Sequence, residues 1–335
     1  MMESFNCRNP WVRKTFLGFA IISIVLVLLE LAIRGIMPFV DSGHKCFELK
    51  SVTPSEFVGP DKALGYTLKD GTFHFENACG LRFSATHRLG KRVVTTPKND
   101  TLPEVWILGD SYGYGYGVDD SCTYAYYLQQ VMPQFSIVNL SVPGYSAVAN
   151  FLQLEALLTT KGKVNKPTVV IFQCSEYDKG RIILSPRMLD AYRSEMQEVV
   201  KLPYVFNGSA GLTIDYKKLP DRNGLITNSL LASTVHKIVL MKMSEGLEQN
   251  SDSVVVALYH RVAQLCKEHE VSLLMLSVHS SRGFETRIQE AVLVNFLNPR
   301  IDTLSVDHTL LPVDNHLSPK GHAYLARALR NSLSL

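Results

Sequence analysis

The fold is decided by residues 105–118, which read VWILGDSYGYGYGV. Four apolar residues at the density of a buried strand run into Gly109, Asp110 and Ser111, and alternating glycines follow in which no regular element can continue. This pattern predicts Ser111 at the tip of a buried strand, with its hydroxyl displayed rather than packed. Because Gly, Asp and Ser are common turn residues, the tripeptide by itself fits a plain strand-to-loop turn equally well.

A second motif, near the C-terminus, favours a catalytic serine. Asp314 and His316 are the acid and the base that a serine nucleophile needs, because imidazole can take the hydroxyl proton and a carboxylate can orient the imidazole. Both residues lie on the loop before a predicted helix over residues 320–333, whose start is marked by a Ser-Pro pair. The two motifs together predict a triad of Ser111, His316 and Asp314.

Two backbone groups are candidates for the oxyanion site of this triad. The negative charge on a substrate carbonyl oxygen needs N–H donors, each worth about 3 to 4 kcal/mol when well placed. The backbone N–H of Ser111 is expected to supply one of them, and that of Gly144, on the loop after the second predicted strand, the other.

Two other histidines compete with His316 for the role of base. His322 falls inside the predicted C-terminal helix, which favours packing or capping, and His308 lies further from the helix start. His316 is therefore the favoured base.

After residue 100 the sequence alternates between strands and helices. This rhythm predicts a three-layer α/β domain over residues 101–335, with its site outside the carboxyl ends of the parallel strands. The predicted strands are the short apolar runs 105–108, 135–140, 168–172, 272–277 and 301–306, and the predicted helices are 124–131, 150–160, 254–269 and 285–296. Residues 178–248 interrupt the rhythm with helices at 186–200 and 230–243 and a hairpin at 211–216, and we interpret them as a lid or rim insertion.

The N-terminal part of the chain predicts a membrane anchor. Residues 15–35 are almost continuously apolar and long enough to cross about 30 Å of hydrocarbon. A cleaved signal peptide is the alternative, but no small-x-small cleavage site follows before Arg34. Basic residues precede the helix, so residues 1–14 are expected in the cytoplasm and the rest outside it. Residues 36–100 predict a connector and a small β-rich segment, with a polar, proline-flanked boundary at 97–103.

Charge and cysteine content exclude some partners. The net charge of +3 is small for 335 residues and no basic block stands out, so nucleic acid is not an expected partner. The six cysteines show no zinc-type spacing. Cys46 and Cys79 lie on the predicted oxidising side and could form a disulfide, although buried free thiols fit as well.

Three motifs together resemble the SGNH (GDSL) hydrolase superfamily. They are Gly109-Asp110-Ser111 with later glycines, the segment from Asn139 to Gly144, and Asp314-Asn315-His316 before Ser-Pro and Gly-His pairs. The likeness spans about residues 100–335, and the anchor with its β-rich segment is similar to membrane-anchored bacterial members. It implies a flavodoxin-like α/β/α fold and a Ser-His-Asp site that handles esters without a metal or cofactor.

One position departs from the family pattern. After the third strand the family has an Asn-Asp pair whose asparagine donates to the oxyanion, whereas this chain has Tyr177 and Asp178. The tyrosine hydroxyl is a candidate oxyanion donor or substrate contact, or the change marks weakened catalysis. Residues 109–113 also match the G-x-S-x-G elbow of α/β-hydrolases, but here the serine follows the first strand and acid and base share one loop, which favours the SGNH interpretation.

The resemblance implies a range of functions. Family substrates include lipids, acetylated sugars and acyl-thioesters, and related extracytoplasmic proteins transfer acetyl groups onto exported polysaccharides. We therefore expect a single-pass, periplasmic or cell-surface esterase acting on acetyl esters of a glycan. An O-acyltransferase with the same triad, working with a multispanning acyltransferase, and a non-catalytic glycan-binding or assembly protein stay open as alternatives.

Overall fold

The computed structural model describes residues 10–40, 49–95, 102–160, 166–195, 201–209, 211–219, 224, 228–278 and 280–333. The chain forms two compact units. The smaller contains Met1–Lys45 and Asp221–Met241, and the larger contains Cys46–Pro220 and Lys242–Leu335. The predicted boundary near residue 100 lies outside the described residues, so the proposed division there stays a prediction.

The smaller unit is built on helix α1, Pro10–Val40. Its segment Arg13–Ile36 is 24 residues long and contains an 18-residue window with a mean hydropathy of 2.8, so it is long and apolar enough to cross a membrane. A signal sequence would have the same length and composition, so the anchor stays a prediction. The unit also holds the first part of helix α8, Leu230–Gln249.

The larger unit is organised around a parallel sheet. Strands β7 (Glu104–Leu108), β8 (Ser136–Asn139), β9 (Pro167–Cys174), β12 (Ser272–Ser277) and β13 (Asn295–Leu297) lie in the order β8-β7-β9-β12-β13. Numbered along the chain this is 2-1-3-4-5, the flavodoxin-like order, whose ligand site lies at the carboxyl ends of the strands where the order reverses. The predicted fold class is confirmed.

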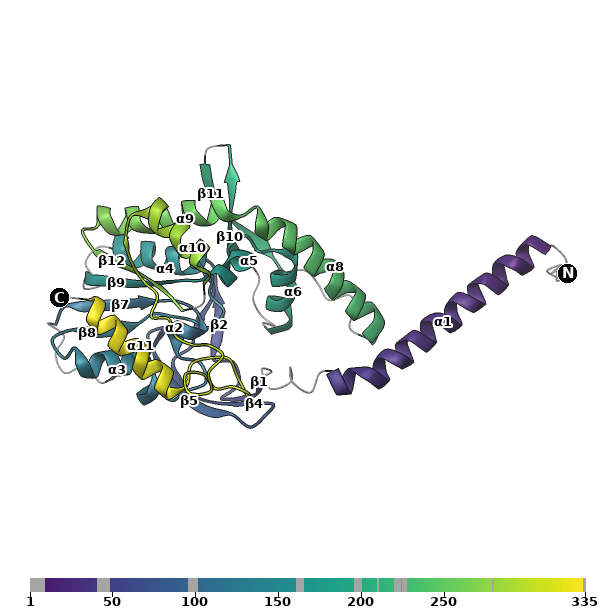
Figure 1. Cartoon of the computed structure of the whole chain (residues 1–335), viewed down its shortest axis with the longest axis horizontal. Coiled ribbons are helices and arrows are strands. Elements are labelled where there is room, and N and C mark those ends of the chain that lie inside the picture. The colour runs from purple at the N-terminus through teal and green to yellow at the C-terminus, as the bar shows by residue number, and fades with distance from the viewer. Residues whose placement is uncertain are drawn as a thin grey trace. The chain divides into compact units, whose positions relative to one another are not determined.

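Helices cover both faces of this sheet (Figure 1). Along β7, Val105 and Ile107 pack with α3 (Tyr124–Val131) and α11 (Pro319–Ser332) on one face. Trp106 and Leu108 pack on the other face with α4 (Ala147–Thr159), α9 (Asp252–Glu268) and α10 (Arg282–Val292). The alternation explains why every apolar residue of β7 is buried, since each face of the strand has its own core.

The β-rich segment before the α/β domain extends the same sheet. Strands β1 (Leu49–Thr53), β4 (Gly71–Asn77), β5 (Arg82–Arg88) and β6 (Lys91–Arg92) pair antiparallel, and β6 joins β8 through the pair Arg92 and Asn139. The result is a nine-stranded mixed sheet. Strands β2 (Val58–Asp61) and β3 (Gly65–Leu68) form a separate pair.

The insertion between β9 and α9 packs partly against this β-rich segment. It contains 3₁₀ helix η3 (Glu176–Asp178), α5 (Lys179–Ile182), α6 (Pro186–Glu195), and the hairpin of β10 (Lys201–Gly208) and β11 (Gly211–Lys218). Leu184, Tyr192 and Leu202 share an apolar cluster with Tyr66 and Tyr145. A role as a lid stays a prediction.

The last strand of the sheet differs from the sequence prediction. Residues 301–306 form no strand, and Leu304 and Val306 lie exposed. The fifth strand is instead β13, which the sequence placed at the end of a helix. That helix, α10, stops earlier because Leu293 adopts a left-handed conformation at its C-cap.

The pairing of Cys46 with Cys79 stays a prediction. Cys79 is disulfide-bonded, whereas Cys46 lies outside the described residues. Cys122, Cys174 and Cys266 are free thiols.

Candidate active site

Ser111 is the first residue of a short helix, α2 (Ser111–Tyr114), directly after β7. The helix starts here because the Asp110 side chain accepts a hydrogen bond from Tyr112 N–H at 2.9 Å. It ends at Gly115, whose φ of 86° is left-handed and whose Cβ, if present, would meet Thr123 at 2.7 Å. The backbone N–H of a first helical residue has no partner within its helix, which leaves that of Ser111 available to a ligand.

The structure brings the three predicted triad residues together. His316 Nε2 lies 2.7 Å from Ser111 Oγ, and His316 Nδ1 lies 2.5 Å from Asp314 Oδ1. The same carboxylate oxygen accepts the backbone N–H of His316 at 2.7 Å. Burial opposes ionisation of Asp314, but these hydrogen bonds from His316 outweigh it and lower the pKa of the carboxyl. Asp314 is therefore a buried, ionised acceptor.

The loop that carries the acid and the base is held at both ends. Leu310 N–H donates to the carbonyl of His316 at 2.9 Å, and Thr309 forms a β-bridge with Leu317. At the far end Ser318 caps α11 by accepting from Gly321 N–H at 3.2 Å. The contacts of Leu310 with His316 and of Thr309 with Leu317 therefore fix the backbone around His316.

Two tyrosine rings from the glycine-rich segment flank the imidazole. The rings of Tyr112 and Tyr116 lie with their centroids 4.9 and 5.0 Å from that of His316. Tyr112 also donates its hydroxyl to the carbonyl of Asn315 at 3.2 Å. The alternating Gly-Tyr sequence thus packs two of its tyrosine rings against the imidazole of His316.

The second predicted oxyanion donor lies on a turn after β8. Val142 N–H donates to the carbonyl of Gly109 at 3.2 Å, so the loops after β7 and β8 run side by side towards Ser111 and Gly144. Gly144 has a φ of 81°, and its carbonyl accepts the Tyr192 hydroxyl at 2.5 Å. The arrangement fits the predicted donor pair, whose catalytic role stays a prediction.

The remaining candidates fall into different places. Tyr177 is 74% exposed, on η3, and lies close enough to Tyr112 to affect its electrostatics. His322 is buried, with a pKa lowered to about 3 by burial, and it accepts the Tyr124 N–H at 3.2 Å. His308 packs against Tyr324. These contacts agree with structural roles for the two rival histidines.

Sequence reasoning missed the residues that hold Asp110. Gln173 Nε2 donates to Asp110 Oδ1 at 2.8 Å, and Arg181 Nη1 donates to Oδ2 at 3.0 Å. The acid of Gly-Asp-Ser is thus fixed by a strand end and by α5 as well as by its own helix. Gln173 could have been noticed as the one glutamine in the mainly apolar strand β9, whereas no sequence pattern marks Arg181 as a partner of Asp110.

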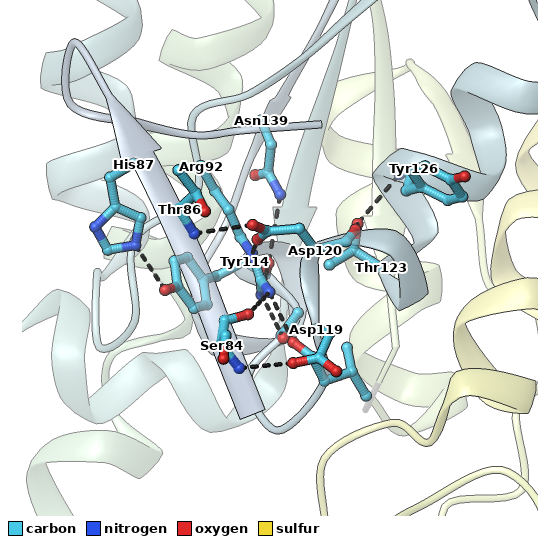
Figure 2. Close-up of polar contacts among 12 residues, drawn as sticks. Ser84, Thr86, His87, Arg92, Tyr114, Asp119, Asp120, Thr123, Tyr126 and Asn139 are labelled. Carbon is cyan, nitrogen blue, oxygen red and sulfur yellow. Dashed lines mark hydrogen bonds and ion pairs between the residues drawn. The ribbon is translucent and has the colours of Figure 1, made fainter. Parts of the chain in front are cut away.

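Arg92 connects the β-rich segment to the segment that follows Ser111 (Figure 2). Its side chain is 0% exposed and pairs with Asp120 at 2.9 Å. It also donates to the carbonyls of Tyr114 at 2.9 Å, Gly115 at 2.6 Å and Val118 at 2.7 Å. The planar guanidinium of Arg92 has five N–H donors, which suit this set of acceptors. The ammonium group of a lysine has only three and could not satisfy them all.

Replacing Arg92 by methionine is expected to destabilise the protein by about 3 to 5 kcal/mol, because it leaves a partly buried carboxylate and three carbonyls without the guanidinium donor. Urea denaturation of the full chain in detergent measures this. The matched control is Arg82→Met, which removes an arginine from the neighbouring strand whose side chain is 76% exposed and pairs with Glu76. This control should cost less than about 1 kcal/mol, and equal losses in the two variants would contradict the role given to Arg92.

Asp178 is a buried acid next to the site. Its Oδ2 accepts the N–H of Ala147, the first residue of α4, at 2.7 Å, and its Oδ1 has no hydrogen-bond partner among the described residues. Burial raises the pKa of Asp178 to about 7, against the opposing effect of Arg181. The native state therefore holds this proton to higher pH than the unfolded chain does.

This raised pKa predicts a pH-dependent stability. The contribution of Asp178 to stability should fall as the pH rises from about 4, near the unfolded pKa, to about 7. Asp178→Asn, which mimics the protonated acid, should therefore gain in Tm relative to the wild type across this range. Thermal unfolding from pH 4 to 8 tests it, with exposed Asp302→Asn as the control, and a constant difference between Asp178→Asn and the wild type would refute it.

Comparisons with known proteins concern the fold. No protein-family model and no curated protein matches the sequence. Solved structures that are similar include TesA, at 12% identity and a TM-score of 0.41, covering 69% of this chain and 98% of that one. The esterase EstA from Pseudoalteromonas sp., inhibited by monoethylphosphonate, is similar at 13% identity and a TM-score of 0.39, covering 69% and 96%.

A lipolytic protein of the G-D-S-L family from Desulfitobacterium hafniense is similar at 13% identity and a TM-score of 0.36, covering 69% of this chain and 99% of that one.

Among the described residues no cluster of His, Cys, Asp or Glu could hold a metal ion. The strand order 2-1-3-4-5, with the Gly-Asp-Ser turn at the end of its first strand, gives this chain the flavodoxin-like architecture expected of the SGNH superfamily.

Proposed function

We propose that the protein is a serine esterase of the SGNH type. The observation that carries the proposal is the continuous chain of hydrogen bonds from Ser111 Oγ through both nitrogens of His316 to Asp314. A serine hydroxyl is a weak nucleophile without a base, and this chain supplies the base and the acid that holds its tautomer.

The proposed mechanism follows the order of events of a serine triad. Ser111 Oγ attacks the ester carbonyl carbon while His316 Nε2 accepts its proton, and Asp314 stabilises the imidazolium. The N–H groups of Ser111 and Gly144 hold the oxyanion. The imidazolium then protonates the leaving alkoxide, and water, activated by His316, releases the acid and restores Ser111.

One feature supports a glycan substrate. The exposed ring of Tyr177, close to Tyr112, offers a surface on which a sugar ring could stack. We therefore favour acetyl esters of a cell-surface glycan, with α1 as the anchor and the larger unit outside the cytoplasm.

A fluorophosphonate probe tests the catalytic proposal. It should label the wild-type chain in detergent and leave Ser111→Ala unlabelled, because the probe traps only an activated serine. His308→Ala should be labelled like the wild type. Absence of labelling in a folded wild-type protein would instead favour the non-catalytic glycan-binding alternative.

Product analysis separates hydrolysis from transfer. Incubation with acetylated glycans and aryl acetates should release acetate if water resolves the acyl-enzyme. Formation of a new acetyl ester on an added sugar acceptor, in preference to acetate, would identify an O-acyltransferase that uses the same triad. Dependence of that transfer on a co-expressed multispanning acyltransferase would identify the partner.

A further inference from the structure

Helix α8 exposes an unusually apolar surface within the smaller unit. Val235, Ile238, Val239 and Met241 are 47 to 54% exposed, although all four lie in one helical stretch of twelve residues, 230–241. At 100° per residue, Val235, Ile238 and Val239 fall on one side of the helix, and Lys237 falls on the opposite side. We call these three residues the apolar face of α8.

The start of α8 is bound to α1 of the same unit. Glu30 of α1 accepts the backbone N–H of Leu230 at 3.0 Å and of Leu231 at 2.8 Å, and it accepts the Ser229 hydroxyl at 2.9 Å. Arg34 pairs with Glu30 at 2.8 Å and donates to the carbonyl of Asn228 at 3.2 Å. The Glu30–Arg34 pair of α1 therefore binds the first N–H groups of α8 and the carbonyl of Asn228, just before this helix.

These contacts place the start of α8 beside Glu30 of α1. Glu30 lies six residues before Ile36, where the apolar segment ends, which corresponds to about 9 Å of helix. If α1 spans a bilayer with Ile36 at the border between hydrocarbon and headgroups, this level lies about 9 Å inside the hydrocarbon. Backbone N–H groups at such a level need partners from the protein. The first three of α8 have them, since Ser229 Oγ also accepts the N–H of Ala232 at 3.1 Å.

We infer that the apolar face of α8 lies against the acyl chains of the lipid bilayer, as a second membrane contact beside α1. A helix with exposed valine and isoleucine on one side binds lipid by burying that side among acyl chains. The inference rests on the membrane anchorage in the proposed function and is independent of the esterase chemistry.

Tryptophan quenching in lipid nanodiscs tests this placement with the full chain. Val235→Trp, Ile238→Trp and Lys237→Trp are each reconstituted as one chain per disc, with and without lipids brominated in the acyl chains. The signal of Trp11 and Trp106, measured on the wild type, is subtracted. We expect at least twofold quenching at positions 235 and 238 and little change at 237.

The other outcomes overturn the inference. Unquenched emission at 235 and 238, or equal quenching at all three positions, would show that this face does not meet lipid selectively. If the face is instead covered by a second copy, quenching will be absent, and reconstitution with an excess of discs will still give discs with two chains. Val239→Trp replaces any variant of the face that fails to fold.

The same discs distinguish this failure from the failure of the proposed function. Trp11 precedes the apolar segment of α1, so its quenching in the wild type reports insertion of the anchor. Fluorophosphonate labelling reports the triad separately. Quenched Trp11 and normal labelling, with no quenching at position 238, would leave the anchor and the esterase intact and remove only the contact of α8.

Discussion

Replacing Ser111 by alanine is expected to lower kcat on an aryl acetate by about 10⁶-fold, since loss of the nucleophile in a serine triad has an effect of this size. The 2.7 Å contact between Ser111 Oγ and His316 Nε2 is the physical basis, because no other hydroxyl is held against that nitrogen in the contacts of the described residues. The residual rate should come from oxyanion binding alone. Initial rates measured at saturating substrate provide the number.

Non-additivity makes this prediction specific to a triad. His316→Ala should reduce kcat about as much as Ser111→Ala, and the double variant should lose little more than either single variant, because the residues act as one unit. His308→Ala is the matched control and should stay within about twofold of the wild type, since its ring packs against Tyr324. Multiplicative losses in the double variant would mean that the two residues act separately.

The sheet was predictable wherever a strand is buried on both faces. Residues 105–108 and 169–172 are uniformly apolar, and each lies in a strand whose two faces have separate cores. The prediction was wrong for 301–306, where Val and Leu alternate with Asp, Thr and Ser and lie exposed. It also missed β13, because a three-residue strand at the sheet edge is too short to show a period.

The proximity of Ser111, His316 and Asp314 was predictable because these residues occur in recognisable short motifs. Gly-Asp-Ser marks a strand end, and Asp314 lies two residues from His316. The residues that hold the surrounding segments in place are not marked by any such motif. Arg92 reaches carbonyls 22 to 26 residues away in the chain, and carbonyls are present in every residue, so no side-chain pattern signals the contact. The link between Glu30 and α8 spans about 200 residues and is equally invisible in the sequence.

Asp314→Asn is expected to lower kcat by about 10⁴-fold near neutral pH while leaving the fold intact. In the structure a single oxygen, Asp314 Oδ1, accepts both the Nδ1–H and the backbone N–H of His316. An asparagine can keep the backbone contact but can present its NH₂ group to Nδ1. This contact would favour the tautomer with its proton on Nε2, which cannot accept the proton of Ser111.

The charge of Asp314 matters as well as its geometry. Because the pKa of this carboxyl is lowered, the group is ionised throughout the neutral range and stabilises the imidazolium formed during attack. An asparagine removes that charge at every pH, so kcat should be low across pH 6 to 8. The matched control is Asp307→Asn on the same segment, whose exposed carboxylate pairs with Lys320 and should matter by less than about twofold. Rates of Asp314→Asn within tenfold of the wild type would show that the acid does not orient the base, and the triad would reduce to a Ser111 and His316 dyad.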